Sequence, residues 1–102
     1  TSLTGSDKWY AVGGMDGRIM KDPGNGLVMF KQLNEPVFGM CDWGGNGLVA
    51  VTNRHLWMQK NDLKIEIPGK NQVFGVVCAA DGPIVFGDRG MAIQYRDKAF
   101  HK

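Results

Sequence analysis

An internal repeat with a period of 36 residues is the feature that most constrains the fold. Val37-Phe38-Gly39 returns as Val73-Phe74-Gly75, and the neighbouring segments fall into register with it. Residues 47–51 lie over 83–87, and 54–62 lie over 89–97 once a single residue is deleted. A fixed period of about 20 to 50 residues is typical of arrays of one supersecondary unit. The sequence therefore predicts a single domain, 1–102, built of like units at about 1–36, 37–72 and 73–102.

Each unit reads as a set of short β-strands. Short apolar runs alternate with turn signals such as Asp16-Gly17, Asp22-Pro23-Gly24 and Pro68-Gly69, and this spacing is typical of all-β folds. No segment keeps a helical period without an interrupting Gly or Pro. We therefore expect an all-β fold of three four-stranded antiparallel repeats of about 36 residues. Segment 1–7 is expected to be a frayed first strand or a tail, and 99–101 stands where the last unit needs its fourth strand.

Repeated small sheets have two faces to cover, so they stack on one another. Four-stranded units arranged around an axis form a β-propeller, which has about four to eight blades. Since three units are too few to close a ring, we expect a β-propeller-like array completed by oligomerisation. Two copies would supply six blades, and the N-terminal residues of a partner would supply the strand missing from the last unit. A monomeric β-barrel or sandwich is the alternative.

Trp9-Tyr10-Ala11-Val12-Gly13-Gly14, followed by Asp16-Gly17-Arg18-Ile19, resembles the blade repeat of sialidase-like and photosystem-assembly-factor-like β-propellers. Similar repeats occur in phage virion proteins, and the pattern returns at 48–51 and 84–90. The resemblance implies propeller blades. The Asp-box of the sialidases, Ser-x-Asp-x-Gly-x-x-Trp, is absent, so the resemblance implies architecture and not activity.

Charge and apolar content bound the partners and the location. The formal net charge is +2 and Lys and Arg are scattered, so neither nucleic acid nor a membrane surface is an expected partner. No apolar run approaches the roughly 20 residues that cross a bilayer, and the polar start contains no signal peptide, so a virion or cytoplasmic location is expected.

Cys41 and Cys78 are expected as reduced core thiols, with a disulfide between adjacent strands as the alternative.

Catalytic and metal-binding patterns are missing from the sequence. The two histidines, His55 and His101, form no His-x-x-x-His pair, and the two cysteines form no Cys-x-x-Cys pair. The serines, Ser2 and Ser6, lie in the polar start, where a catalytic triad is not expected. The sequence therefore predicts no enzymatic activity, no cofactor and no metal site.

Binding through turn residues is a more favourable interpretation. Trp9 and Trp57 are expected to fill the core, whereas a tryptophan in a glycine-rich turn can stack on a ligand. Because propeller turns gather at the ends of the axis, polar turn residues are expected to share a surface with it that suits a sugar. The candidate ligand-binding residues are Trp43, Asn46, Asn53, Arg54, Asp81 and Arg89.

The functional hypothesis is a non-catalytic, self-associating β module. Apolar edge strands such as 73–79 must be covered by something, and the expected partner is a further copy, as a dimer or higher oligomer, or another assembly protein. A structural component of a phage virion, associated with tail or capsid, would fit this description. The alternative is a small oligomeric lectin that binds glycans.

Overall fold

The computed structural model describes residues 2–6, 9–22, 26, 28–44 and 47–102, with side chains given for 11, 13–21, 26, 29–44 and 47–102. Within these ranges the strands are β1 (Ser2–Ser6), β2 (Trp9–Gly13), β3 (Arg18–Asp22), β4 (Val28–Gln32), β5 (Gly39–Asp42), β6 (Leu48–Val51), β7 (His55–Met58), β8 (Leu63–Glu66), β9 (Val73–Ala79), β10 (Gly82–Gly87), β11 (Ala92–Arg96) and β12 (Ala99–His101). Two 3₁₀ segments, η2 (Lys60–Asp62) and η3 (Asp88–Gly90), lie in turns.

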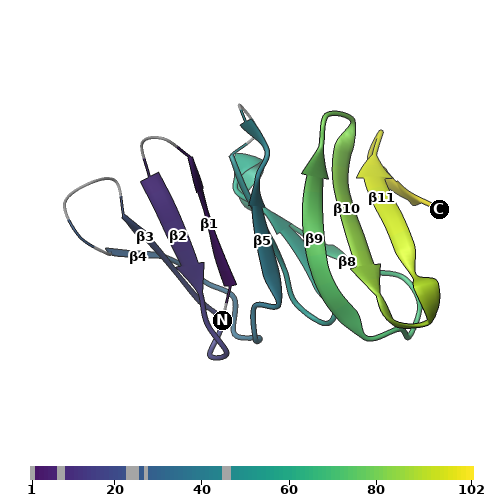
Figure 1. Cartoon of the computed structure of the whole chain (residues 1–102), viewed down its shortest axis with the longest axis horizontal. Coiled ribbons are helices and arrows are strands. Elements are labelled where there is room, and N and C mark those ends of the chain that lie inside the picture. Colours follow the sequence, from purple (N-terminus) through teal and green to yellow (C-terminus); the bar gives the residue numbers. More distant parts are fainter. Residues whose placement is uncertain (1, 7–8, 23–25, 27, 45–46) are drawn as a thin grey trace.

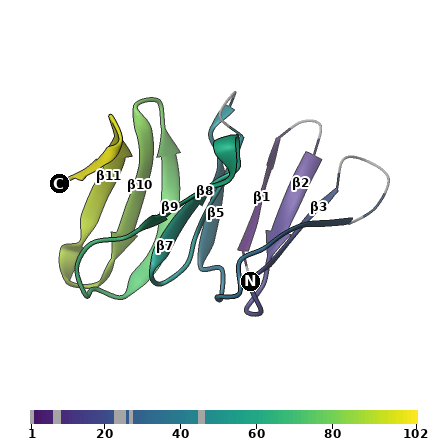
Figure 2. The same cartoon turned by 180° about the vertical axis from the view of Figure 1, so that it is seen from behind.

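The strands form three antiparallel sheets of four consecutive strands each: sheet I (β1–β4), sheet II (β5–β8) and sheet III (β9–β12). The all-β class and the three four-stranded sheets are thus confirmed. The sheets stack face to face in chain order, and the first strands β1, β5 and β9 lie side by side along one edge (Figures 1 and 2). The described strands form three separate sheets and not the single closed barrel that was named, with a sandwich, as the alternative.

Two expectations about the ends of the sheets are corrected. The third unit does not lack a strand, because β12 pairs with β11 through Gln94–His101, Tyr95–Phe100 and Arg96–Ala99. A type I′ turn makes this possible, since Asp97 and Lys98 both adopt the positive φ angles that it requires, 53° and 65°. At the other end, β1 is neither a tail nor frayed, because it pairs with β2 along its whole length.

The core is divided into two apolar layers, one on each face of sheet II. The layer toward sheet I includes Ile19, Leu33 and Val37 with the side chain of Trp57, which is 4% exposed, as expected for a core tryptophan. The side chain of Trp9 lies outside the described residues. Strand β6 is buried on both faces, which explains its uninterrupted apolar sequence, Leu-Val-Ala-Val.

The repeated Val-Phe-Gly motif has a packing role at the inner edge. A Cβ atom added to Gly39 would lie 3.0 Å from both the Cα atom of Gly75 and the backbone nitrogen of Val76. Glycine at position 39 therefore lets the backbones of β5 and β9 approach closely. This contact holds the first strands of sheets II and III together.

Candidate functional site

Sheet II presents alternate rows of side chains to its two neighbours. The row Met40–Ala50–Trp57 packs toward sheet I. The neighbouring rows of the sheet point the other way and pack toward sheet III. In these rows Val49, Val51 and Leu56 have no exposed surface, and Met58 is 7% exposed. Both faces of sheet II are therefore covered by protein.

Sheet III repeats this arrangement, but only one of its faces is covered. The row Val76–Val85–Ile93 packs toward sheet II and is equivalent to Met40–Ala50–Trp57. The rows on either side of it face outward. At the positions equivalent to Cys41, Val49, Val51 and Leu56, they hold Val77, Ile84, Phe86 and Ala92.

We call these four residues, Val77, Ile84, Phe86 and Ala92, the open face. Val77 is 54% exposed and Phe86 39% exposed. The Phe86 ring lies over Gly75, because a Cβ atom on that glycine would lie 2.8 Å from the ring. Gly75 is the counterpart of Gly39, so Phe86 occupies the space that a further first strand would approach.

The outward face of sheet I, at the other end of the stack, carries a pair of methionines. In sheet I, Ile19 points toward sheet II, and the next residue, Met20, therefore points away from it. Met20 pairs across β3 and β4 with Met29, which is 52% exposed. The outward faces of sheets I and III thus both carry apolar side chains, and in sheet I Arg18 and Gln32 lie on the same face as Met20.

The predicted ligand-binding residues are divided between the two ends of the sheets. Trp43 lies in the β5–β6 turn and Asp81 in the β9–β10 turn, and both line one pocket of about 300 Å³. The β9–β10 turn is at the upper end of the sheets in Figure 1. Asn53 and Arg54 lie at the lower end and line a pocket of about 490 Å³, and Arg89 lines a neighbouring pocket of about 250 Å³. Asn46 lies outside the described residues. The physical reason for the division is that successive turns of an antiparallel sheet alternate between its ends.

At the lower end, one candidate residue has a structural role. The Oδ1 atom of Asn53 accepts a hydrogen bond of 3.1 Å from the backbone N–H of Val73, at the start of β9. Asp88 has a similar role, since its Oδ1 atom accepts the backbone N–H of Gln72 at 2.9 Å. These side chains attach turns to the connection between sheets II and III. Turn-forming preference accounts for them without a ligand.

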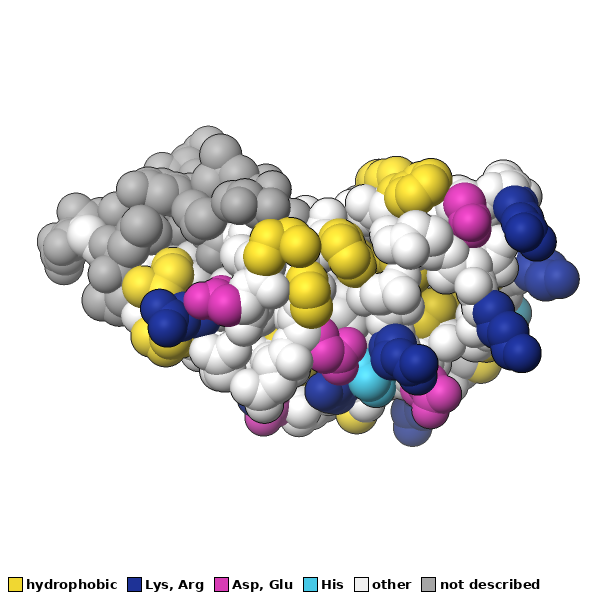
Figure 3. Space-filling model, turned by 90° about the horizontal axis from the view of Figure 1, so that it is seen from below, with side chains coloured by type: hydrophobic (Ala, Val, Ile, Leu, Met, Phe, Trp, Pro, Cys, Tyr) yellow, Lys and Arg dark blue, Asp and Glu magenta, His cyan; other side chains and the backbone are white. Residues whose placement is uncertain are grey.

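Glu35, in the connection between sheets I and II, is the centre of a polar cluster that sequence reasoning missed. Histidine, basic and acidic side chains lie together on this lower face (Figure 3). The Oε1 atom of Glu35 accepts a hydrogen bond of 2.6 Å from Thr52, and its Oε2 atom lies 2.7 Å from Nδ1 of His55 and 3.4 Å from Nζ of Lys64. Partial burial opposes ionisation, but the bonds from Thr52, His55 and Lys64 and the charge of His55 lower the pKa of Glu35 below 4.5.

Substitution of Glu35 by Gln is expected to reduce the acid sensitivity of the fold. The pKa of Glu35 is lower in the folded than in the unfolded chain. Its contribution to the free energy of unfolding is therefore complete at pH values above its unfolded-state pKa, and it is lost as the pH falls through its folded-state pKa. Glu35→Gln should cost about 1–2 kcal/mol at pH 7 and lose less further stability than the wild type between pH 6 and pH 3. Urea denaturation at a series of pH values measures this difference.

Glu66→Gln is the matched control for that experiment. Glu66 is exposed at the end of β8 and makes no ion pair among the residues that the structure describes. Its substitution should leave the wild-type pH dependence in place. Equal pH dependence of the wild type and Glu35→Gln would contradict the assignment.

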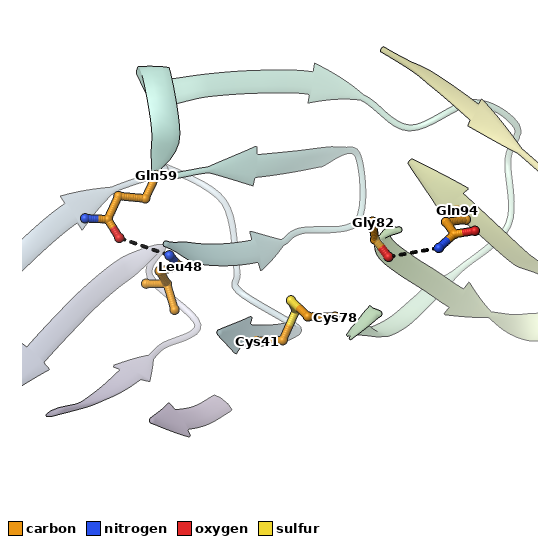
Figure 4. The surroundings of a disulfide bond; sticks show 6 residues. All are labelled: Cys41, Leu48, Gln59, Cys78, Gly82 and Gln94. Carbon is orange, nitrogen blue, oxygen red and sulfur yellow. Dashed lines mark hydrogen bonds between the residues drawn. A yellow bond between two sulfur atoms is a disulfide. The ribbon is translucent and has the colours of Figure 1, made fainter. Parts of the chain in front are cut away.

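The expectation of two reduced cysteines is wrong, because Cys41 and Cys78 form a disulfide (Figure 4). Cys41 points from β5 toward sheet III and Cys78 points from β9 toward sheet II, with their Cα atoms 5.7 Å apart. This distance is within the range that disulfides require. The bond therefore fastens the first strands of sheets II and III across their shared apolar layer.

The described side chains contain no group of three or more His, Cys, Asp or Glu residues placed to hold a metal ion. None of the helical segments in the described ranges has the length and hydrophobicity needed to cross a bilayer. Comparison with protein-family models, with curated proteins and with solved structures gave no match.

Proposed function

We propose that this chain is a non-catalytic, self-associating β module that acts as a structural or assembly protein. The observation that carries the proposal is the open face of sheet III. Its residues occupy the positions at which sheet II buries Val49, Val51 and Leu56 completely. A sheet face built on the same plan as a covered one is suited to receive another sheet of the same kind, and docking requires the Phe86 ring to move away from Gly75.

The occupant that we assign to the open face is sheet I of a second copy. The outward face of sheet I is apolar at Met20 and Met29. A contact between sheet III of one copy and sheet I of the next would continue the order in which the sheets pack within one chain. If two such contacts close on each other, two copies form a ring of six sheets, which is a propeller-like assembly. Apolar burial would drive this association, since exposed apolar patches on a monomer are a liability.

The disulfide bears on where such a module would work. Disulfides persist in oxidising settings that include virion and cell surfaces and are rare in the cytosol. The Cys41–Cys78 bond therefore favours a virion component over a cytoplasmic one.

Light scattering or sedimentation equilibrium of the purified chain tests the proposal. The wild type should have at least twice the mass of the 11.2 kDa chain. Val77→Lys and Met29→Lys should each reduce it to the mass of one chain, because either change places a charge in the apolar contact. Met15→Lys is the control, since Met15 is 62% exposed in the turn between β2 and β3 and lies outside both faces. A single-chain mass for the wild type, or equal effects of all three variants, would contradict self-association.

A further inference from the structure

We further propose that the pocket at the upper end, between sheets II and III, binds a neutral saccharide. Four turns meet there: the β5–β6 turn with Trp43, η2 with Asn61, the β9–β10 turn with Asp81, and the β11–β12 turn with Lys98. The volume of about 300 Å³ is at the lower limit of ligand pockets and suits one or two sugar rings.

The lining combines aromatic rings with polar groups. Trp43 and Tyr95 are both half-buried, and the ring of Tyr95 is fixed by an edge-to-face contact with Phe100 at 5.2 Å between centroids. Two aromatic side chains offer flat apolar surface on which the C–H face of a pyranose can stack. An aromatic surface beside hydrogen-bonding side chains matches the two faces of a sugar.

The lining carries charges of both signs, with three basic side chains and two acidic ones: Lys60, Arg96, Lys98, Asp81 and Asp97. Arg96 and Asp97 form an ion pair with each other at 3.6 Å. Asp81 and Lys98 make no side-chain bond within the described residues, and they supply one acceptor group and one donor group of opposite sign. Asn61 adds an amide that can both donate and accept. Hydroxyl groups can donate to Asp81 and accept from Lys98, whereas an anion would be repelled by Asp81 and a cation by Lys98.

The pocket is held in shape before any ligand binds. The disulfide lies two residues before Trp43 and three before Asp81, so it fixes the two strands from which these residues extend. Gln59 and Gln94 fix the turns: Oε1 of Gln59 accepts the N–H of Leu48 at 2.9 Å, and Nε2 of Gln94 donates to the carbonyl of Gly82 at 3.1 Å (Figure 4). Preorganisation of this kind reduces the entropy lost on binding.

The larger pocket at the lower end does not share these features. Its lining is polar, with Arg54, Lys70 and Glu66 among the charged residues and no aromatic ring other than the imidazole of His55. Stacking on a sugar therefore requires the upper pocket. The inference is independent of self-association, because every residue that lines the pocket comes from one chain.

Saccharide binding can be measured by following the indole N–H signals in two-dimensional NMR spectra during titration. The probes are glucose, galactose, mannose and N-acetylglucosamine, followed by their disaccharides. At least one of them should shift the Trp43 signal and leave that of Trp57, which is buried and bonded to Asp62 at 2.7 Å. Asp81→Asn and Lys98→Gln should each weaken binding about tenfold, the usual effect of a lost hydrogen bond.

Asp88→Asn, at the opposite end of sheet III, is the matched control and should leave the saccharide affinity unchanged. Asp81 and Lys98 are exposed, so their variants are expected to fold, which keeps the test sharp even if Trp43→Ala unfolds the chain. The proposal is overturned if none of the probes shifts the Trp43 signal, or if Asp81→Asn and Lys98→Gln bind as tightly as Asp88→Asn.

Discussion

Reduction of the Cys41–Cys78 disulfide is expected to lower the free energy of unfolding by about 4 kcal/mol. The bond joins positions 37 residues apart, and a closed loop of that length removes about this much conformational free energy from the unfolded chain. For a domain of this size the loss corresponds to a decrease in Tm of roughly 15 °C or more. Thermal unfolding with and without a phosphine reductant measures it.

The double variant Cys41→Ala/Cys78→Ala provides the control for this experiment. It should unfold at the temperature of the reduced wild type, and the reductant should not change its Tm. Thiol titration of the unfolded wild type should detect no free thiol before reduction, since both cysteines are paired. An unchanged Tm after complete reduction would show that the bond does not constrain the fold.

Leu56→Ala is expected to destabilise the protein by about 2–5 kcal/mol. Leu56 has no exposed surface and lies in the apolar layer between sheets II and III. Its truncation removes apolar burial and leaves a cavity among side chains that belong to two different sheets, which limits how far the site can collapse. Urea denaturation followed by circular dichroism gives the change in free energy.

Leu63→Ala makes the same chemical change in the same sheet at an exposed position. Leu63 is 40% exposed at the start of β8, so its truncation should cost less than about 1 kcal/mol. Losses of equal size for the two variants would contradict the assignment of Leu56 to the core.

The repeat was visible in the sequence, but its register was not. Alignment of residues 47–51 with 83–87 places Ala50 over Phe86. In the structure Phe86 is instead equivalent to Val51, because Met40 and its partner Ala50 are ten residues apart, whereas Val76 and Val85 are nine apart. The connection between β10 and β11 is one residue longer than the connection between β6 and β7, so the two sheets are in the same register again from β11 onward.

A shift of one residue in a strand exchanges its two faces. The sequence alignment therefore placed Ile84, Phe86 and Ala92 over residues of sheet II that face sheet I. Of the four residues of the open face, Val77 alone was aligned with its structural equivalent, Cys41. The sequence alignment placed its one deletion in the turn before residue 54. In the structure the turn before β10 is one residue shorter than its counterpart and the turn after β10 is one residue longer, so the period of 36 residues is restored. Cross-strand pairing was needed to assign the faces.

The candidate site follows the same pattern. Sequence reasoning identified Trp43 and Asp81 as turn residues, and both line the upper pocket. It did not find Tyr95 or Lys98, because their strand and turn read as ordinary hairpin sequence. The Glu35 cluster was equally hidden, since Thr52, His55 and Lys64 are brought to Glu35 by the packing of sheet I on sheet II.

The sequence by itself determined the strand content and the repeated unit, because apolar alternation and Gly-rich turns are local properties of the chain. Tertiary structure alone decided that Cys41 and Cys78 pair, which residues of sheet III face outward, and which turns share a pocket. These features depend on the stacking of one sheet on the next. Such contacts join residues far apart in the chain, and they leave no periodic signal in it.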